Sequence, residues 1–212
     1  MHVCSNDLGN TSRIYLYSLI LSVMSFFLLL LPLYDFLKNS YGLTIPIWIE
    51  TPSIIGLYAF YINIFDKVLW KYKAIRWFGL PKIPNVNGVW KATIRSSHGV
   101  EKEAVATICQ NYSKFSMILK TDESVSQTTM ASFELGNPIH RTLTYTYISK
   151  PLPTSPTSMN IHEGTGSLEI LKGDEEMRGY YYSGRGRQNY GEIHLKMERD
   201  NLNTKLIVPE GS

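Results

Sequence analysis

Seven tyrosines in the second half of the chain are the residues with the most suggestive chemistry. Tyrosine rings fill hydrophobic cores, and this is the ordinary role of most of them. Each buried phenol needs a hydrogen-bond partner, however, so an interior lined with several is costly unless it contains water or a polar ligand. The rings are also stacking platforms for nucleobases, worth about 1–3 kcal/mol per base. The seven are Tyr112, Tyr145, Tyr147, Tyr180, Tyr181, Tyr182 and Tyr190.

A glycine-rich turn, residues 184–189, adds two arginines, Arg185 and Arg187. A guanidinium group suits bidentate contact with a phosphate or with the edge of a guanine base. A solvated basic turn has the same composition, so both interpretations stay open.

Enzymatic signatures are absent from the sequence, which has no G-x-x-x-x-G-K-[ST] loop and no H-E-x-x-H motif. The glycines of residues 164–167 lie inside a strand pattern, where small residues ease a bend. We interpret His162-Glu163 as a polar pair at a strand start rather than an acid–base pair. Cys4 and Cys109 make no spacing motif, which argues against a disulfide framework or a zinc site and favours a reducing compartment. We expect no catalytic activity, no metal and no cofactor.

In the region that carries these residues, which begins after Pro81 and Pro84, apolar and polar side chains alternate. A period of two is typical of β-strands. In residues 141–149, for example, Leu143, Tyr145 and Tyr147 alternate with threonines. Turn sequences rich in Gly, Asn and Ser separate the runs. The predicted strands are 86–96, 103–111, 113–121, 126–135, 141–149, 161–171, 177–183 and 190–199.

Eight strands in succession, each with one polar face, predict an antiparallel up-and-down β-barrel, because closure removes open sheet edges. A barrel of this size is filled by side chains or holds one small ligand. A two-sheet sandwich is the alternative. In both cases the predicted domain covers residues 81–212.

Two apolar runs precede this domain. Residues 14–34 contain no charged side chain and, at about 1.5 Å per residue, are long enough to cross a hydrocarbon core of about 30 Å. A cleaved signal peptide is the alternative, but the run exceeds a signal core and no cleavage site follows it. The second run, residues 45–65, contains Glu50, which we place at the interface; an intramembrane functional carboxylate is the competing interpretation. The sequence thus predicts a transmembrane two-helix hairpin, with spans at about 14–36 and 47–70 of a module covering residues 1–80.

The basic charge of the chain lies beside the apolar runs. Residues 1–85 hold seven Lys or Arg side chains against four acidic ones, whereas the remainder holds fourteen of each. This balance argues against binding of long nucleic acid by the C-terminal domain. Five of the basic residues follow the second run, and only Lys38 lies between the runs. The positive-inside rule therefore predicts a multi-pass protein with both termini in the cytoplasm.

A series of short motifs follows the apolar runs in a fixed order. They are Pro84–Lys91, Ser96-Ser97, Gln110–Tyr112, Leu119–Thr121, Ser124–Ser126, Leu143–Tyr147, His162–Thr165 and Gly179–Tyr181, then Arg185, Arg187 and Gly191. With the two-helix prefix, their order and spacing resemble the CD-NTase-associated membrane effectors of bacterial CBASS anti-phage systems. The resemblance spans nearly the whole chain, although the family often has Trp where this sequence has Tyr112.

The resemblance implies a function in antiviral defence. A phage-activated nucleotidyltransferase makes a cyclic oligonucleotide, the barrel binds it, and the effector oligomerises. Its helices then disrupt the bacterial inner membrane, and the infected cell dies by abortive infection. The implied partners are a cyclic dinucleotide from a cognate CD-NTase, the lipid bilayer and further copies of the chain.

A cyclic dinucleotide presents two base faces and two phosphates, and the candidate ligand-binding residues are assigned accordingly. The candidates for stacking are Tyr145, Tyr147 and Tyr181. The candidate donors to phosphates or base edges are Thr121, Ser124, Ser126, Arg185 and Arg187. The motifs that carry the resemblance add Tyr112, His162 and Thr165.

Two other functions fit the same architecture. A membrane-tethered, lipocalin-like barrel would bind a lipid or another hydrophobic small molecule. A structural membrane subunit would have a solid core, packed with Trp90, Leu143, Leu168 and Leu195, and no cavity. The sequence leaves both open.

Overall fold

The chain divides into two compact units. The computed structural model describes residues 2–5, 8–42, 50–72, 77, 79, 83–135, 141–153, 155, 160–171, 173–184 and 189–198. One unit combines Met1–Ser5 with Ile83–Ser212, and the other is Asn6–Lys82. Each is considered by itself below.

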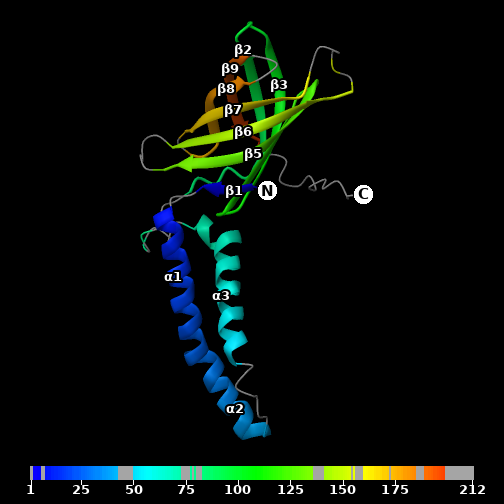
Figure 1. Ribbon diagram of the computed structural model, residues 1–212. Coiled ribbons are helices and arrows are strands. Elements are labelled where there is room, and N and C mark those ends of the chain that lie inside the picture. The colour runs from blue at the N-terminus through cyan, green and yellow to red at the C-terminus, as the bar shows by residue number, and fades with distance from the viewer. Residues whose placement is uncertain are drawn as a thin grey trace. The chain divides into compact units, whose positions relative to one another are not determined.

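The first unit is a closed barrel of eight antiparallel strands in sequence order, which confirms the predicted barrel and excludes the two-sheet alternative (Figure 1). Each strand pairs with the next, and β9 pairs with β2 to close the ring. Every predicted strand matches an observed one with ends that differ by at most two residues. The strands are β2 (Gly88–Ser96), β3 (Glu101–Gln110), β4 (Lys114–Lys120), β5 (Ser124–Glu134), β6 (Thr142–Pro151), β7 (His162–Ile170), β8 (Glu176–Ser183) and β9 (Tyr190–Met197).

Large apolar side chains fill one end of the barrel. They come from the first residues of the even-numbered strands and from the last residues of β7 and β9, because alternate residues of each strand point inward. Side chains packed this closely hold the strands in one register. The fully buried ones are Trp90, Phe115, Leu143, Leu168, Met177 and Leu195, and Ile108 near the end of β3 joins them.

A buried glutamine fixes the segment that enters this end. The Gln110 side-chain oxygen accepts a hydrogen bond from the Val86 amide (3.0 Å), and its nitrogen donates to the Pro84 carbonyl (3.0 Å). The indole of Trp90 donates to the Val86 carbonyl (2.9 Å). These bonds offset the cost of removing the polar groups around the start of β2 from water.

A ninth strand, β1 (His2–Ser5), was not predicted and lies in the barrel wall. The strands β4 and β5 pair only over Ile118–Lys120 and Val125–Gln127. Beyond a bulge at Thr128–Met130, β1 lies between them, antiparallel to β4 and parallel to β5. Four residues are too few to show a periodic pattern, and their place depends on a gap formed by residues more than 100 positions away.

The second unit is helical. It comprises α1 (Leu8–Ser25), α2 (Leu31–Tyr41) and α3 (Glu50–Lys67), with a π-helical turn, η1 (Phe26–Leu30), between α1 and α2 and a 3₁₀ turn, η3 (Leu69–Lys71), after α3. Pro32 explains the π turn, because it has no N–H to donate and its ring crowds the carbonyl of Leu28. Together α1, η1 and α2 run from Leu8 to Tyr41, so this helical stretch is longer than the predicted span 14–36. The second, predicted over 47–70, begins at Glu50 and has Pro52 in its first turn, where proline is tolerated.

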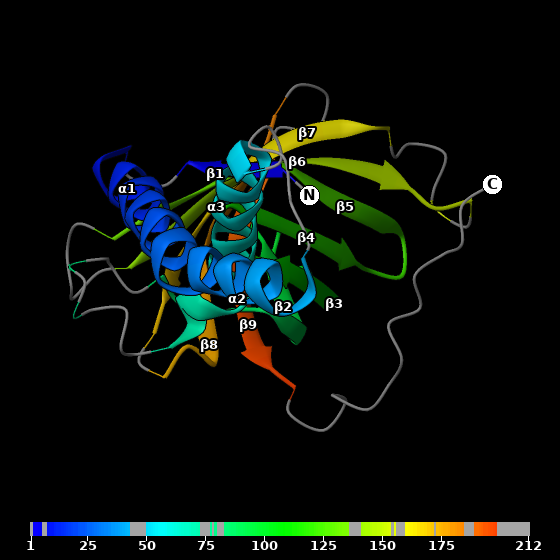
Figure 2. The same ribbon diagram turned by 90° about the horizontal axis from the view of Figure 1, so that it is seen from below.

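The helices α1 and α3 lie side by side (Figure 2). On α1, Ser18, Ser22 and Ser25 are buried, and the Ser25 hydroxyl is 2.6 Å from that of Tyr61 on α3. Large apolar side chains such as Leu28, at 66% exposure, point outward. Within the described residues, one helix, Ser12–Tyr41, is long and apolar enough to cross a membrane. That this helix or α3 spans a membrane remains a prediction.

Candidate functional site

A cavity of about 370 Å³ occupies the end of the barrel opposite the apolar core. The connections β2–β3, β4–β5, β6–β7 and β8–β9 meet at this end, and His98, Thr121, Ser149 and Asn189 are among the residues that line it. The interior is therefore not packed solid, which removes the main argument for a purely structural barrel.

Two tyrosine rings lie over glycines of the neighbouring strand on one wall of the cavity. Tyr145 and Tyr147 of β6 pair across the ladder with Gly166 and Gly164 of β7. A Cβ atom on either glycine would stand 2.4 Å from the Cζ atom of the tyrosine opposite. The glycines thus leave the space in which the rings lie against the barrel wall, with room for a ligand beside them.

Tyr181 of β8 repeats this arrangement. It pairs with Gly191 of β9, and a Cβ atom there would stand 2.8 Å from Cε1 of the ring. It also pairs with Gly166 on its other side. Three aromatic rings therefore line a continuous stretch of wall from β6 to β9, an arrangement that suits stacking against flat heterocycles.

The hydroxyl of Tyr145 has no hydrogen-bond partner among the residues that the structure describes, although the side chain is only 4% exposed. Burial raises the pKa of Tyr145, and the neighbouring Tyr147 and Tyr181 raise it further. The phenol therefore keeps its proton at neutral pH and can donate a hydrogen bond into the cavity. In contrast, the Tyr147 hydroxyl lies 3.4 Å from the Ser183 hydroxyl and from the Tyr182 carbonyl.

Small hydroxyl side chains from β5 form another part of the lining. Ser124, Ser126 and Thr128 alternate along the strand and all line the cavity. The Thr128 hydroxyl accepts the amide of Met117 (3.0 Å), because β4 and β5 no longer pair there. These residues offer donors and acceptors at spacings of two along the strand.

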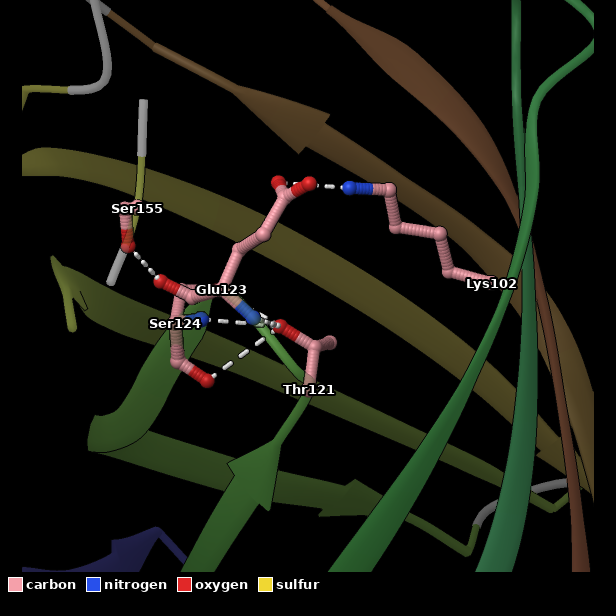
Figure 3. A network of polar contacts seen from close by, with 5 residues as sticks. All are labelled: Lys102, Thr121, Glu123, Ser124 and Ser155. Atoms are coloured by element: carbon pink, nitrogen blue, oxygen red, sulfur yellow. Dashed lines mark hydrogen bonds and ion pairs between the residues drawn. The ribbon is translucent and has the colours of Figure 1, made fainter. Parts of the chain in front are cut away.

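A tight turn from β4 to β5 brings Glu123 to the cavity, where its carboxylate lies 2.5 Å from the ammonium of Lys102 on β3 (Figure 3). The Thr121 hydroxyl accepts the amides of Glu123 (3.3 Å) and Ser124 (2.9 Å) and so shapes the turn. The Glu123 carbonyl accepts the Leu152 amide (2.8 Å) and the Ser155 hydroxyl. The turn is thereby tied to β3 and to the β6–β7 connection.

His162, at the start of β7, is buried and lines the cavity. Its Nδ1 atom lies 3.0 Å from the Asn160 carbonyl oxygen, so Nδ1 carries a proton in this contact. The described residues contain no cluster of three or more His, Cys, Asp or Glu side chains suited to a metal ion.

The cavity gathers seven of the eleven candidate ligand-binding residues: Thr121, Ser124, Ser126, Tyr145, Tyr147, His162 and Tyr181. Two do not line it. Tyr112 is buried in the β3–β4 connection, at the opposite end of the barrel, and Thr165 points outward between the inward positions Gly164 and Gly166. Arg185 and Arg187 lie outside the described residues.

Sequence reasoning missed several lining residues, above all Lys102 and Glu123. Lys102 shares the inward face of β3 with Ala104, Ala106 and Ile108, but the predicted strand began one residue after it. The alternation would have found it had the strand been extended. Glu123 carries no such signal, because turn residues have no period.

The arrangement combines flat aromatic faces, several hydroxyls, an unpartnered phenol and one lysine–carboxylate pair. Such a lining suits a ligand that has aromatic rings and polar or anionic groups. It suits a purely hydrophobic ligand poorly, because that ligand would leave buried hydroxyls without partners.

Comparisons with known proteins agree with this chemistry. The family model described as Cap15, cyclic dinucleotide receptor domain, matches residues 81–197, a range that holds all eight strands of the barrel ring. CD-NTase-associated protein 15 of Yersinia aleksiciae is 30% identical over 180 residues, which cover 82% of this chain and 84% of that protein. Residues 81–212 alone would not supply such coverage, so the similarity includes part of the helical segment.

Proposed function

The chain belongs to the CBASS Cap15 effector family, and we propose that its barrel binds a cyclic dinucleotide made by a cognate CD-NTase. The observation that carries this proposal is the row of three tyrosine rings, each lying over a glycine, along one wall of the cavity. Stacking on such rings holds a nucleobase, and the hydroxyls and Lys102 supply partners for sugar and phosphate oxygens.

The helical unit, in this proposal, is a two-span module of the bacterial inner membrane, with both termini in the cytoplasm and the barrel as its sensor. Two features support it. Ser18, Ser22 and Ser25 of α1 are buried, whereas large apolar side chains such as Leu21, Phe27 and Leu28 are exposed, which is the reverse of a soluble helix. Five of the seven basic residues of residues 1–85 follow the second apolar run, as the positive-inside rule requires of a cytoplasmic flank.

The output that we propose is oligomerisation on ligand binding and disruption of the inner membrane by the helices, ending in abortive infection. The barrel itself then needs no catalytic residue. The family membership supports this proposal, as does the attachment of the sensing barrel to a helix long and apolar enough to cross a membrane.

Ligand binding is tested with the full-length protein in detergent micelles. Isothermal titration against cyclic dinucleotides of each purine and pyrimidine pairing, with linear dinucleotides as controls, should give micromolar or tighter binding of at least one cyclic compound. Tyr181→Ala should weaken it by about tenfold or more. The matched control is Tyr182→Ala, because Tyr182 is the next residue, 62% exposed and outside the cavity. Equal effects of both variants, or no binding of any cyclic compound, would count against the proposal.

Membrane disruption needs a separate test. Vesicles of bacterial lipid that contain the full-length protein should release a trapped dye when the bound cyclic dinucleotide is added, and not when a linear one is added. Release without ligand, or none with it, would contradict a ligand-gated output. Recovery of bound lipid from the barrel, with no nucleotide binding, would favour the lipocalin-like alternative.

A further inference from the structure

The cavity contains a lysine and a carboxylate that neutralise each other. Among the described residues that line it, Lys102 is the only lysine or arginine and Glu123 the only carboxylate. Their charged atoms are 2.5 Å apart, and their side chains are 31% and 29% exposed. The ligand of the proposed function is an anion, and Lys102 is the lysine or arginine that the described part of the lining offers to it.

Lys102 is held through the pairing of β3 with β2, and Glu123 through the backbone of its turn. Its backbone amide, its carbonyl and the turn around it are fixed by Thr121, Leu152 and Ser155 (Figure 3). Lys102 reaches the carboxylate with a flexible four-carbon chain, and no further hydrogen bond or ion pair of its ammonium is found within the described residues. Of the two side chains, that of the lysine is the longer and has the wider reach.

We propose that Glu123 is a specificity-determining residue that competes with the ligand's phosphate for Lys102, an inference that rests on the proposed function. Before binding, the carboxylate holds the lysine. A phosphodiester at this place must replace the Glu123 carboxylate as the ion-pair partner of Lys102. The carboxylate then lies nearby and repels the phosphodiester. Glu123 thus lowers the affinity for every anion and admits those whose stacking and hydroxyl contacts offset the repulsion.

If Glu123 competes for Lys102, removing its charge should strengthen ligand binding even though the residue lines the binding site. Glu123→Gln removes the competing charge and keeps the size of the side chain, so it should tighten binding of the cyclic dinucleotide by about twofold to fivefold, the range of an ordinary partly exposed ion pair. Lys102→Met should weaken binding. The gain in Glu123→Gln should shrink as salt is added, because the repulsion that it removes is screened.

The experiment measures dissociation constants of the full-length protein in detergent at low and at raised salt. Glu101→Gln is the matched control: it removes the same charge from the residue next to Lys102 on β3, but Glu101 is exposed and ion-paired with Arg95, outside the cavity. It should leave the affinity unchanged. Glu123→Ser is a second variant in case the side-chain amide of Glu123→Gln perturbs folding. Cooperative thermal unfolding verifies that each variant is folded.

The outcomes distinguish failure of the competition for Lys102 from failure of the proposed function. If Glu123→Gln and Glu123→Ser both bind as the original or more weakly while folded, the competition is refuted. Weakening confined to ligands with one particular base would also refute it, because Glu123 would then read a base edge. If the original protein binds no cyclic dinucleotide at all, the proposed function fails and this inference fails with it.

Discussion

Tyr145 and Gly166 face each other across the β6–β7 ladder, and the ring occupies the space that a side chain at Gly166 would fill. A Cβ atom there would stand 2.4 Å from Cζ and 2.5 Å from the hydroxyl oxygen of the tyrosine. The ring lies against the wall because the neighbouring strand has glycine at this position. A ring displaced from the wall would turn into the cavity that it now lines.

Replacing this glycine should therefore close the cavity without unfolding the barrel. In Gly166→Ala the clash falls on the far end of a side chain that can rotate, so we expect a loss of about 1–3 kcal/mol in the free energy of unfolding. The affinity for the cyclic dinucleotide should fall by about tenfold or more, since the displaced ring takes the place of a base. Titration calorimetry and chemical denaturation measure the two effects.

The control for this variant is Gly179→Ala on β8. A Cβ atom there would stand 1.8 Å from the backbone oxygen of Ser167, which has no side-chain rotation to escape by. This variant should lose stability first and binding only as a consequence. Unchanged affinity in a folded Gly166→Ala protein would show that Tyr145 does not border the ligand.

The hydroxyl of Tyr145 should contribute to binding more than to stability. It has no partner within the described part of the chain, so Tyr145→Phe should leave the free energy of unfolding unchanged or slightly raised. If the ligand accepts its proton, affinity should fall by about threefold to tenfold, the worth of one net hydrogen bond. Tyr147→Phe is the comparison, because that hydroxyl has partners at 3.4 Å and its loss should lower stability. A Tyr145→Phe protein that binds normally would exclude the phenol as a donor.

The free energy of unfolding should fall at alkaline pH because of the ionisation of the same Tyr145 phenol. Burial raises the pKa of Tyr145 above its ordinary value of 10.0 in the folded protein. Above pH 10 the unfolded chain loses this proton and the folded barrel keeps it, so the stabilisation is present below pH 10 and is lost as the pH rises. Denaturation curves between pH 8 and 11 should show a steeper decline for the original protein than for Tyr145→Phe. Parallel curves would contradict this assignment.

The barrel was predictable because each strand has one buried and one solvated face, which leaves a period of two in the sequence. The turns were marked by Gly, Asn and Ser. The same alternation grouped Tyr145 and Tyr147 with Leu143 on one face of their strand, and it would have turned Thr165 outward had its phase been followed through Gly164 and Gly166.

The rest depended on contacts between residues distant in sequence. Gly166 has a role only once the register brings Tyr145 opposite it, so its sequence context suggested no more than a bend. Lys102 resembled a solvated strand end, and only closure of the barrel brings it to Glu123. For the same reason the four residues of β1 were not predicted: the gap that they fill does not exist in any local segment.

The place of β1 can be tested by a disulfide cross-link, because one of the two cysteines that it needs, Cys4, is already present in β1. Cys4 pairs in register with Ala131 of β5. Neighbouring strands are about 4.8 Å apart, within the range that a disulfide bridges. In a Cys109→Ser background, Ala131→Cys should therefore form an intramolecular disulfide with Cys4 under mild oxidation. Non-reducing electrophoresis and intact mass should show a monomer lighter by about two hydrogens.

Met130→Cys is the matched control, because Met130 lies next to Ala131 but has no register partner in β1 and is 64% exposed. It should cross-link far less. Deleting His2–Ser5 should also lower the free energy of unfolding, since the facing edges of β4 and β5 then lose their partner. Equal cross-linking of both cysteine variants, or cross-linked dimers in place of monomers, would show that β1 does not occupy this gap within its own chain. A dimer confined to Ala131→Cys would instead mean that the strand is exchanged between two copies.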